Sequence, residues 1–183
     1  RDYYASRGLG DVYKRQIVGC PGSGKTTLAL KLGEALDLPI YHLDKIYHKP
    51  NWQKPTKEEW RATLNQIMSN DEWILDGNYS STLEMRTQQA DAIIWLNYST
   101  LTCLKRIFKR YDENQNKDRV DRAEGCDEKL DIEFVRHVLN FKKDYGKQFK
   151  LLMEKFPDKK FIILQNSRDA EKLLEQAKLN KTI

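Results

Sequence analysis

One glycine-rich stretch constrains this chain more than any other, because residues 19–26 match the pattern G-x-x-x-x-G-K-[ST] at every defined position. Apolar residues precede the stretch and a helical pattern follows it, which is the context that the pattern requires. Glycines in such a loop let successive backbone N–H groups point inward around an anion, and the lysine adds a positive charge. The stretch therefore predicts a phosphate-binding loop, with a chance match in a glycine-rich turn as the alternative. The residues expected to contact phosphate are Gly19, Cys20, Pro21, Gly22, Ser23, Gly24, Lys25, Thr26 and Thr27.

Composition favours a single globular, soluble domain. The 183 residues are 39% hydrophobic and 32% charged, and no apolar run approaches the roughly 20 residues that span a membrane. Cys20, Cys103 and Cys126 lack metal-ligand spacing, and no secretory signal is visible. We therefore expect reduced thiols and a cytoplasmic protein.

The first sixteen residues do not read as part of this domain. Residues 6–16 resemble the in-frame translation of a transposase-type sequencing adapter, so we interpret residues 1–16 as an artefact and 17–183 as the domain. A genuine basic arm is the alternative. Without this segment the formal net charge falls from +5 to +3, which is weak support for binding nucleic acid. Only Ile17 and Val18 then remain of a first strand that should have about five or six residues.

Short apolar runs alternate with helical patterns along the rest of the chain, which is typical of a three-layer α/β fold. Thr56 to Glu59 also read as a capping box, which predicts the start of the second helix. The predicted strands cover residues 39–44, 72–79, 92–97 and 159–164, and the predicted helices cover 26–36, 56–68, 101–111, 130–155 and a last segment from 166.

Two acids follow predicted strands at the edge where ligands of α/β proteins bind. Asp76 is expected to hold Mg²⁺ through waters, together with the hydroxyl of Thr26. Asp44 is a candidate to orient or deprotonate an acceptor hydroxyl, although a solvated acid at a strand end is the alternative. Asn97 ends the next strand where many phosphate-loop proteins have an acid.

Aromatic side chains are concentrated in the loop of residues 45–55, which contains Tyr47, His48 and Trp52. They could stack on a base or anchor the loop, and the sequence leaves both interpretations open. On the long helix, His137 is interpreted as structural or exposed rather than catalytic.

A polar, charge-dense segment, residues 112–129, predicts a mobile lid. It contains Arg119 and Arg122, which could bring positive charge to a transferred phosphoryl group when the lid closes. Arg106 and Arg110 share one face of the preceding helix, since they are four residues apart. A basic helical face is otherwise most often only solvated.

These motifs together resemble adenylate kinase and its nucleoside-monophosphate kinase relatives. More closely, His42 to Asp44, Trp52, Trp73 to Tyr79, Arg86 and Gly125-Cys126 resemble the adenylate-kinase-related proteins called DNA topology modulation (FlaR-type) proteins. The resemblance implies a five-stranded parallel sheet of order 2-3-1-4-5, flanked by helices, with a short lid.

The resemblance also implies roles for arginines. Arg106 would pack against adenine, Arg110 would reach phosphate, and Arg119 and Arg122 would be lid arginines. The Pro-Arg of the adenylate kinase Asp-Gly motif is replaced here by Asn78-Tyr79, so Arg86 is expected to clamp the acceptor instead.

The expected function is transfer of the γ-phosphoryl group from ATP·Mg²⁺ to a small acceptor, which could itself be a nucleotide. The expected catalytic residues are Lys25, Asp44, Arg86, Arg119 and Arg122. A nucleotide-regulated DNA-binding or topology-modulating protein is one alternative, and an ATP hydrolase or switch is another. The acceptor and the oligomeric state are not indicated by the sequence.

Overall fold

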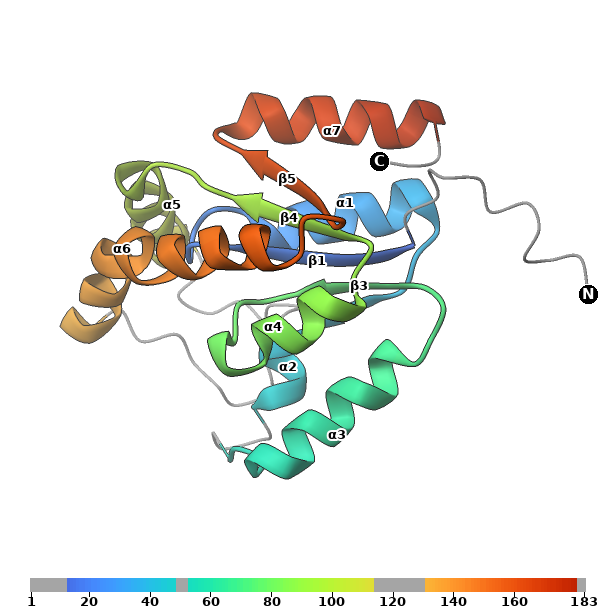
Figure 1. Cartoon of the computed structure of the whole chain (residues 1–183). Helices are drawn as coiled ribbons and strands as arrows, with labels where there is room; N and C mark the ends of the chain where they lie inside the picture. The colour runs from blue at the N-terminus through green and yellow to red at the C-terminus, as the bar shows by residue number, and fades with distance from the viewer. Residues whose placement is uncertain (1–12, 49–52, 114–130, 181–183) are drawn as a thin grey trace, which may run out of the picture.

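The computed structural model describes residues 13–48, 53–113 and 131–180. Its centre is a parallel sheet of five strands in the order β2-β3-β1-β4-β5, which confirms the predicted fold class (Figure 1). The strands are β1 (Lys14–Gly19), β2 (Ile40–His42), β3 (Trp73–Asp76), β4 (Ala92–Leu96) and β5 (Lys160–Leu164). The helices are α1 (Lys25–Leu36), α2 (Leu43–Tyr47), α3 (Lys57–Met68), α4 (Ser80–Gln89), α5 (Thr100–Glu113), α6 (Ile132–Lys155) and α7 (Ser167–Asn180).

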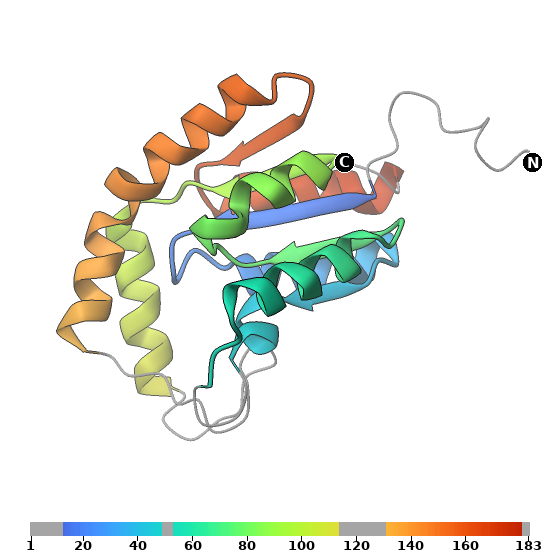
Figure 2. The ribbon, with the colours of Figure 1, turned by 60° about the horizontal axis from the view of Figure 1, so that its bottom comes forward.

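Helices cover both faces of the sheet, as alternating strands and helices require (Figure 2). Helices α1 and α7 pack together on one face, while α3, α4 and α6 lie on the other. The central strands β1, β3 and β4 are buried on both sides, which explains their continuous apolar runs. Thr56 and Glu59 form the predicted capping box at the start of α3.

The first strand begins earlier than expected. Residues 14–16, which the sequence analysis set aside, pair with β3 on one side, and Arg15 and Gln16 also pair with β4 on the other. Arg15 and Gln16 are 1% and 0% exposed. Strand β1 therefore begins at Lys14, and the expectation that only Ile17 and Val18 remain of it is wrong. The domain boundary at residue 17 stays a prediction. The adapter-like origin of these residues stays a prediction.

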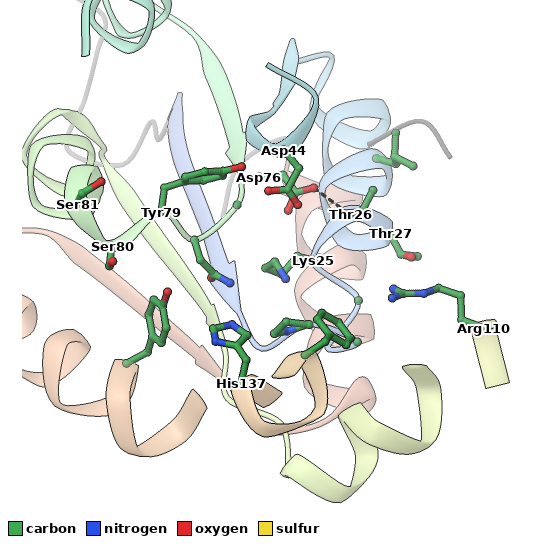
Figure 3. Close-up of a pocket in the computed structure, with 18 residues that line it drawn as sticks. Lys25, Thr26, Thr27, Asp44, Asp76, Tyr79, Ser80, Ser81, Arg110 and His137 are labelled. Atoms are coloured by element: carbon green, nitrogen blue, oxygen red, sulfur yellow. Dashed lines mark hydrogen bonds between the residues drawn. The ribbon is translucent and has the colours of Figure 1, made fainter. Parts of the chain in front are cut away.

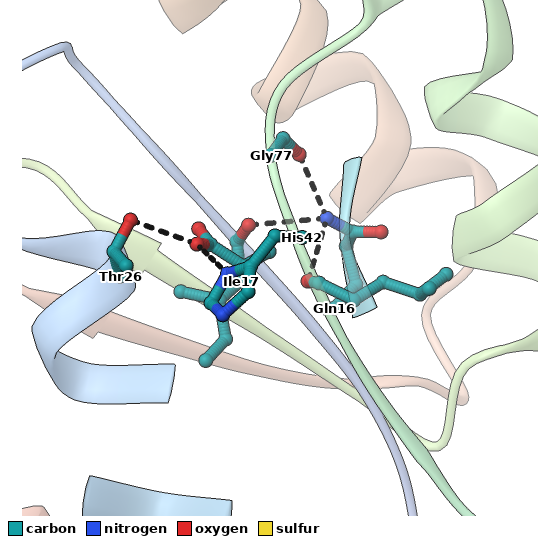
Figure 4. Close-up of polar contacts among 7 residues, drawn as sticks. Gln16, Ile17, Thr26, His42 and Gly77 are labelled. Carbon is teal, nitrogen blue, oxygen red and sulfur yellow. Dashed lines mark hydrogen bonds and ion pairs between the residues drawn. The ribbon is translucent and has the colours of Figure 1, made fainter. Parts of the chain in front are cut away.

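The two buried polar side chains of β1 differ in how well their polar atoms are paired. Gln16 Nε2 donates to the carbonyl of Gly77 at 2.9 Å, with longer bonds to Ile17 and Leu75 (Figure 4). In contrast, Nε and Nη1 of Arg15 have no hydrogen-bond partner in the described part of the chain. Burial lowers the Arg15 pKa to about 10. A charge without full pairing therefore sits in the centre of the sheet.

The second strand is shorter than predicted. Its pairing with β3 covers only residues 40–42, and the chain then enters the short helix α2. Asp44 therefore lies in the first turn of α2, not at a strand end. Because β2 is an edge strand, one side of it is unpaired, and leaving the sheet there costs few hydrogen bonds.

Candidate functional site

The glycine-rich loop connects β1 to α1 at the carboxyl edge of the sheet. Gly22 and Gly24 adopt φ of 77° and 95°, a region that side chains disfavour. A Cβ on Gly22 would lie 2.5 Å from the carbonyl oxygen of Cys103 in α5, so the loop packs closely on that helix. Lys25 begins α1, and its Nζ donates to the carbonyl of Cys20 at 3.3 Å. The loop, the ammonium group and the positive end of α1 together favour an anion.

Cys20, in the loop, and Cys103, in α5, connect the loop to this helix on its buried side. Both thiols are free and buried, and they are hydrogen-bonded to each other. This hydrogen bond, followed by burial, raises the pKa of the Cys20 thiol. Cys20 therefore supports the loop through its backbone and a neutral thiol, and it supplies no nucleophile.

A carboxylate, a hydroxyl and an imidazole meet beside the loop. Asp76, at the end of β3, accepts hydrogen bonds on Oδ2 from Thr26 Oγ1 at 2.9 Å and from His42 Nδ1 at 3.0 Å (Figure 4). Asp76 is only 4% exposed, and its Oδ1 has no partner among the described residues. An unpaired buried carboxylate oxygen is costly unless a cation or donor reaches it.

This arrangement fits Mg²⁺, which typically takes one or two carboxylates and fills its remaining positions with phosphate and water. Thr26 and Asp76 line the same cavity as the phosphate loop. No group of three or more His, Cys, Asp or Glu that could hold a metal occurs in the described ranges. The site therefore suits a cation shared with a phosphate ligand rather than one held by protein groups alone.

The turn after β3 is fastened to the phosphate loop by Asn78. Its Oδ1 accepts from the N–H of Gly19 at 3.0 Å, and its Nδ2 donates to the carbonyl of Gly19 at 2.9 Å. This reciprocal pair fixes the spacing between the loop and the start of α4. Asn78 departs from the adenylate kinase motif, and no local pattern in the sequence predicts its contacts with Gly19.

Asp44 faces the loop from α2 and is held by Tyr79. The Tyr79 hydroxyl is hydrogen-bonded to Asp44, and burial, followed by the charge of Asp44, raises the pKa of Tyr79. Tyr79 therefore stays protonated and donates to the carboxylate. Its ring packs against Tyr47 and Trp60, with centroids 4.7 and 5.3 Å away.

For Tyr47, this packing distinguishes between the two interpretations of the aromatic loop, which were stacking on a base and anchoring the loop. Tyr47 contacts Trp60 and Tyr79, so it anchors the loop rather than presenting a ring for stacking on a base. His48 contacts Tyr47 edge to face, and burial lowers the His48 pKa. Trp52 lies outside the described residues.

The structure corrects the role expected for Arg86. Its side chain is completely buried, and it is not among the residues that line the cavity. The guanidinium donates to the carbonyl oxygens of Gly77, Asn78 and Tyr79, to Thr82 and to the side chain of Gln16. Burial lowers its pKa to about 9. Arg86 therefore stabilises the turn between β3 and α4 from its buried side, because α4 places this residue between the helix and the sheet.

The arginines of α5 lie on the opposite side of the phosphate loop. Arg106 donates to the carbonyl of Ser23 at 3.0 Å and to the Ser167 hydroxyl at 2.6 Å. Its guanidinium also lies 5.2 Å from the centre of the Tyr98 ring. Arg110 lines the cavity near Thr27 (Figure 3). The expected lid arginines, Arg119 and Arg122, and the Gly125-Cys126 pair lie outside the described residues.

Two adjoining cavities meet at the loop. The larger, of about 790 Å³, contains Lys25, Thr26, Asp44, Asp76 and Tyr79, and α6 adds Phe134, His137 and Tyr145 (Figure 3). The smaller, of about 360 Å³, lies between α1, α5 and α7 and includes Lys31, Tyr98, Arg106 and Ser167. Gly22, Gly24, Thr27 and Arg110 line both cavities. An extended ligand could therefore cross the loop from one to the other.

The contribution of α6 was missed by sequence reasoning. Phe134 and His137 are three residues apart, and Tyr145 follows His137 by eight, so all three lie along one stripe of the helix and the helical spacing is visible in the sequence. The stripe also contains Phe141, which stacks on Tyr145 at 4.3 Å. Which side of the stripe reaches the cavity depends on how α6 docks against α5, and no local pattern encodes this docking.

A family model described as an AAA domain (AAA_18) matches residues 16–129, which is more than half of the chain. A search of curated proteins found no match. In the part of the chain that the structure describes, no helix is both long and apolar enough to cross a membrane.

Solved structures of kinases share the fold at low sequence identity. Shikimate kinase from Acinetobacter baumannii, in complex with shikimate, has a TM-score of 0.60 and 19% identity, covering 92% of this chain and 94% of that one. Deoxyadenosine kinase from M. mycoides with bound dATP has a TM-score of 0.54 and 20% identity, covering 91% and 98%. A gluconokinase from Sinorhizobium meliloti 1021 has a TM-score of 0.53 and 13% identity, covering 93% and 96%.

Proposed function

The chain belongs to the AAA domain family AAA_18, and on this premise we propose that it transfers the γ-phosphoryl group of ATP to a small acceptor. The observation that carries the proposal is the meeting of three groups in one cavity. The phosphate loop with Lys25, the Thr26–Asp76 pair and the carboxylate of Asp44 all line it. Phosphoryl transfer needs positioning and charge neutralisation more than covalent chemistry, and these groups supply both.

ATP would lie across the two cavities. Its phosphates would bind the loop, where Lys25 neutralises charge on the outer phosphates. Its base would enter the smaller cavity beside Arg106, whose guanidinium is fixed by Ser23 and Ser167. A planar guanidinium held in this way suits stacking on a base. Arg110, which lines both cavities, would contact the phosphates between them.

Thr26 and Asp76 would hold Mg²⁺, and His42 would orient the Asp76 carboxylate. When bound, the ion neutralises charge on the transferred phosphoryl group. The acceptor would occupy the end of the larger cavity near Asp44 and Tyr79. Arg119 and Arg122 of the expected lid remain proposed contributors of positive charge to the transferred phosphoryl group.

The other hypotheses make different predictions. An ATP hydrolase or switch would consume ATP at the same rate with or without an acceptor. The closer likeness to DNA topology modulation proteins, and a DNA-binding role with it, stays a prediction of the sequence. Salt-sensitive binding of DNA by the chain without residues 1–12 would support that role.

The test measures ADP formation and phosphorylated product with a panel of nucleotides and small hydroxyl compounds. Lys25→Ala should abolish transfer, because the loop loses its only side-chain cation for the outer phosphates. Lys147→Ala is the matched control, since Lys147 is exposed on α6 and does not line the cavity. Equal turnover by Lys25→Ala and Lys147→Ala would refute the role of the loop.

A further inference from the structure

We propose that the acceptor is an uncharged hydroxyl compound, bound by Asp44 with Tyr79 as its positioning residue, and not a compound that already carries a phosphate. This inference rests on the proposed phosphotransferase function and concerns the acceptor end of the same cavity. It follows from the charges and hydroxyl groups that line this end.

Charge is distributed unevenly along the larger cavity. Among the described residues that line this cavity, Lys25 is the only lysine and Arg110 is the only arginine. Lys25 lies at the phosphate loop, and Arg110 projects toward Thr27 on the side away from Tyr79 (Figure 3). Both cations are therefore placed to serve the phosphates of ATP.

The acceptor end is lined by acidic and neutral groups. Asp44 reaches it from α2, where the Tyr79 hydroxyl lies beside it, and Ser80 and Ser81 line the same cavity at the start of α4 (Figure 3). The nearest arginine along the chain, Arg86, is fully buried beneath the turn and donates to its carbonyl oxygens. A phosphorylated acceptor would carry a phosphate group of about two negative charges toward the carboxylate of Asp44. Among the described residues that line this end, no lysine or arginine balances those charges.

A hydroxyl group, by contrast, suits this end of the cavity. Asp44 is exposed to the cavity, and a carboxylate has about four acceptor positions, so it can accept from Tyr79 and from a substrate hydroxyl together. Tyr79 is fixed by its contacts with Tyr47 and Trp60 and by an unusual backbone φ of 43°. The tyrosine therefore holds the carboxylate in one orientation before a substrate arrives.

The chemical step balances with these groups. The acceptor oxygen forms a bond to the γ-phosphorus, and the bond from that phosphorus to the β–γ bridging oxygen breaks. The electron pair of the broken bond leaves with ADP. The proton of the attacking hydroxyl passes to Asp44 and then to water, which is the role of a general base.

The test uses matched pairs of compounds, each uncharged hydroxyl compound beside its monophosphate: nucleosides, sugars and polyols, with hydroxy acids added. The full chain is incubated with ATP and Mg²⁺, and product is detected by mass spectrometry. We expect phosphorylation of an uncharged member and at least tenfold lower kcat/KM for its monophosphate. Transfer only to monophosphates or hydroxy acids would overturn this inference and leave the phosphotransferase function standing. ATP hydrolysis with no transfer to any compound would instead overturn the function.

Variants separate the two residues. Asp44→Asn should lower kcat about 10²- to 10⁴-fold, remove the acidic limb of the pH profile and leave the KM for ATP unchanged. Tyr79→Phe should keep the ring packing but raise the KM for the acceptor and lower kcat less. Asp158→Asn is the matched control, because Asp158 is exposed and remote from the cavity. An unchanged pH profile in Asp44→Asn would exclude the proposed proton transfer.

Discussion

Arg15, the buried arginine of the central strand β1, allows a direct test of what an incompletely paired charge costs the fold. Arg15 is 1% exposed in β1, and its Nε and Nη1 have no hydrogen-bond partner in the described part of the chain. Each unsatisfied buried donor costs about 1–3 kcal/mol. Attraction from Asp91, Tyr13 and Glu72 offsets part of this cost. Replacing Arg15 by leucine, a shorter side chain without polar atoms, should therefore raise the free energy of unfolding.

The shift in the Arg15 pKa gives a second measure of the same cost. Lowering the pKa from 12.5 to about 10 corresponds to roughly 3 kcal/mol against the charged form. Because the folded-state pKa lies below that of the unfolded chain, the penalty is present in full below pH 10 and is relieved as the pH rises above it. Both measures predict that Arg15→Leu stabilises the protein by about 2–3 kcal/mol at pH 7.

Urea denaturation followed by circular dichroism measures this difference, and a thermal scan should show a rise of about 4–12 °C for a chain of this length. The gain should be constant between pH 6 and 9. Arg61→Leu, at an exposed position on α3, is the control and should change stability by less than about 0.5 kcal/mol. A lower or unchanged stability of Arg15→Leu at an unchanged m value would refute the reasoning.

Three further substitutions test other parts of the account. Arg86→Ala should destabilise the fold by about 3–5 kcal/mol, because buried carbonyl oxygens lose their donors; a loss below about 1 kcal/mol in urea denaturation would show that the network is unimportant. Gly22→Ala should reduce ATP affinity at least tenfold in calorimetric titration, because Gly22 has φ of 77° and a Cβ there would lie 2.5 Å from a backbone oxygen. Gly146→Ala in α6 is the control: a Cβ there meets open space, so this variant should bind ATP normally. His42→Ala should weaken the apparent Mg²⁺ affinity about 10- to 100-fold by freeing Asp76 to rotate, and an unchanged Mg²⁺ dependence of ATP binding would contradict this.

Local patterns predicted the parts of the fold that local physics determines. The capping residues Thr56 and Glu59 specify a helix start without help from distant segments, and the structure has this cap. The apolar runs specify strands buried on both faces, and β3 and β4 have this burial. The phosphate loop is defined by its glycine spacing, and Gly22 and Gly24 adopt the expected backbone.

The features that the sequence could not reveal depend on tertiary packing. Arg86 is a charged residue on a short helix, and nothing local indicates that its helix turns this position toward the sheet. Residues 14–16 belong to β1 because their backbones pair with two neighbouring strands. This pairing offsets the cost of burying the polar side chains of Arg15 and Gln16. His137 and Tyr145 reach the cavity only because α6 packs on α5.

The most direct test of the central claim is a single-turnover reaction with ATP labelled in the γ-phosphoryl group and enzyme in excess. The account predicts that the label moves to an uncharged hydroxyl acceptor faster than to water, and that Lys25→Ala moves none while Lys147→Ala behaves as the unmodified protein. Label appearing only as inorganic phosphate, at a rate that no acceptor changes, would contradict the claim that this site transfers a phosphoryl group to an acceptor.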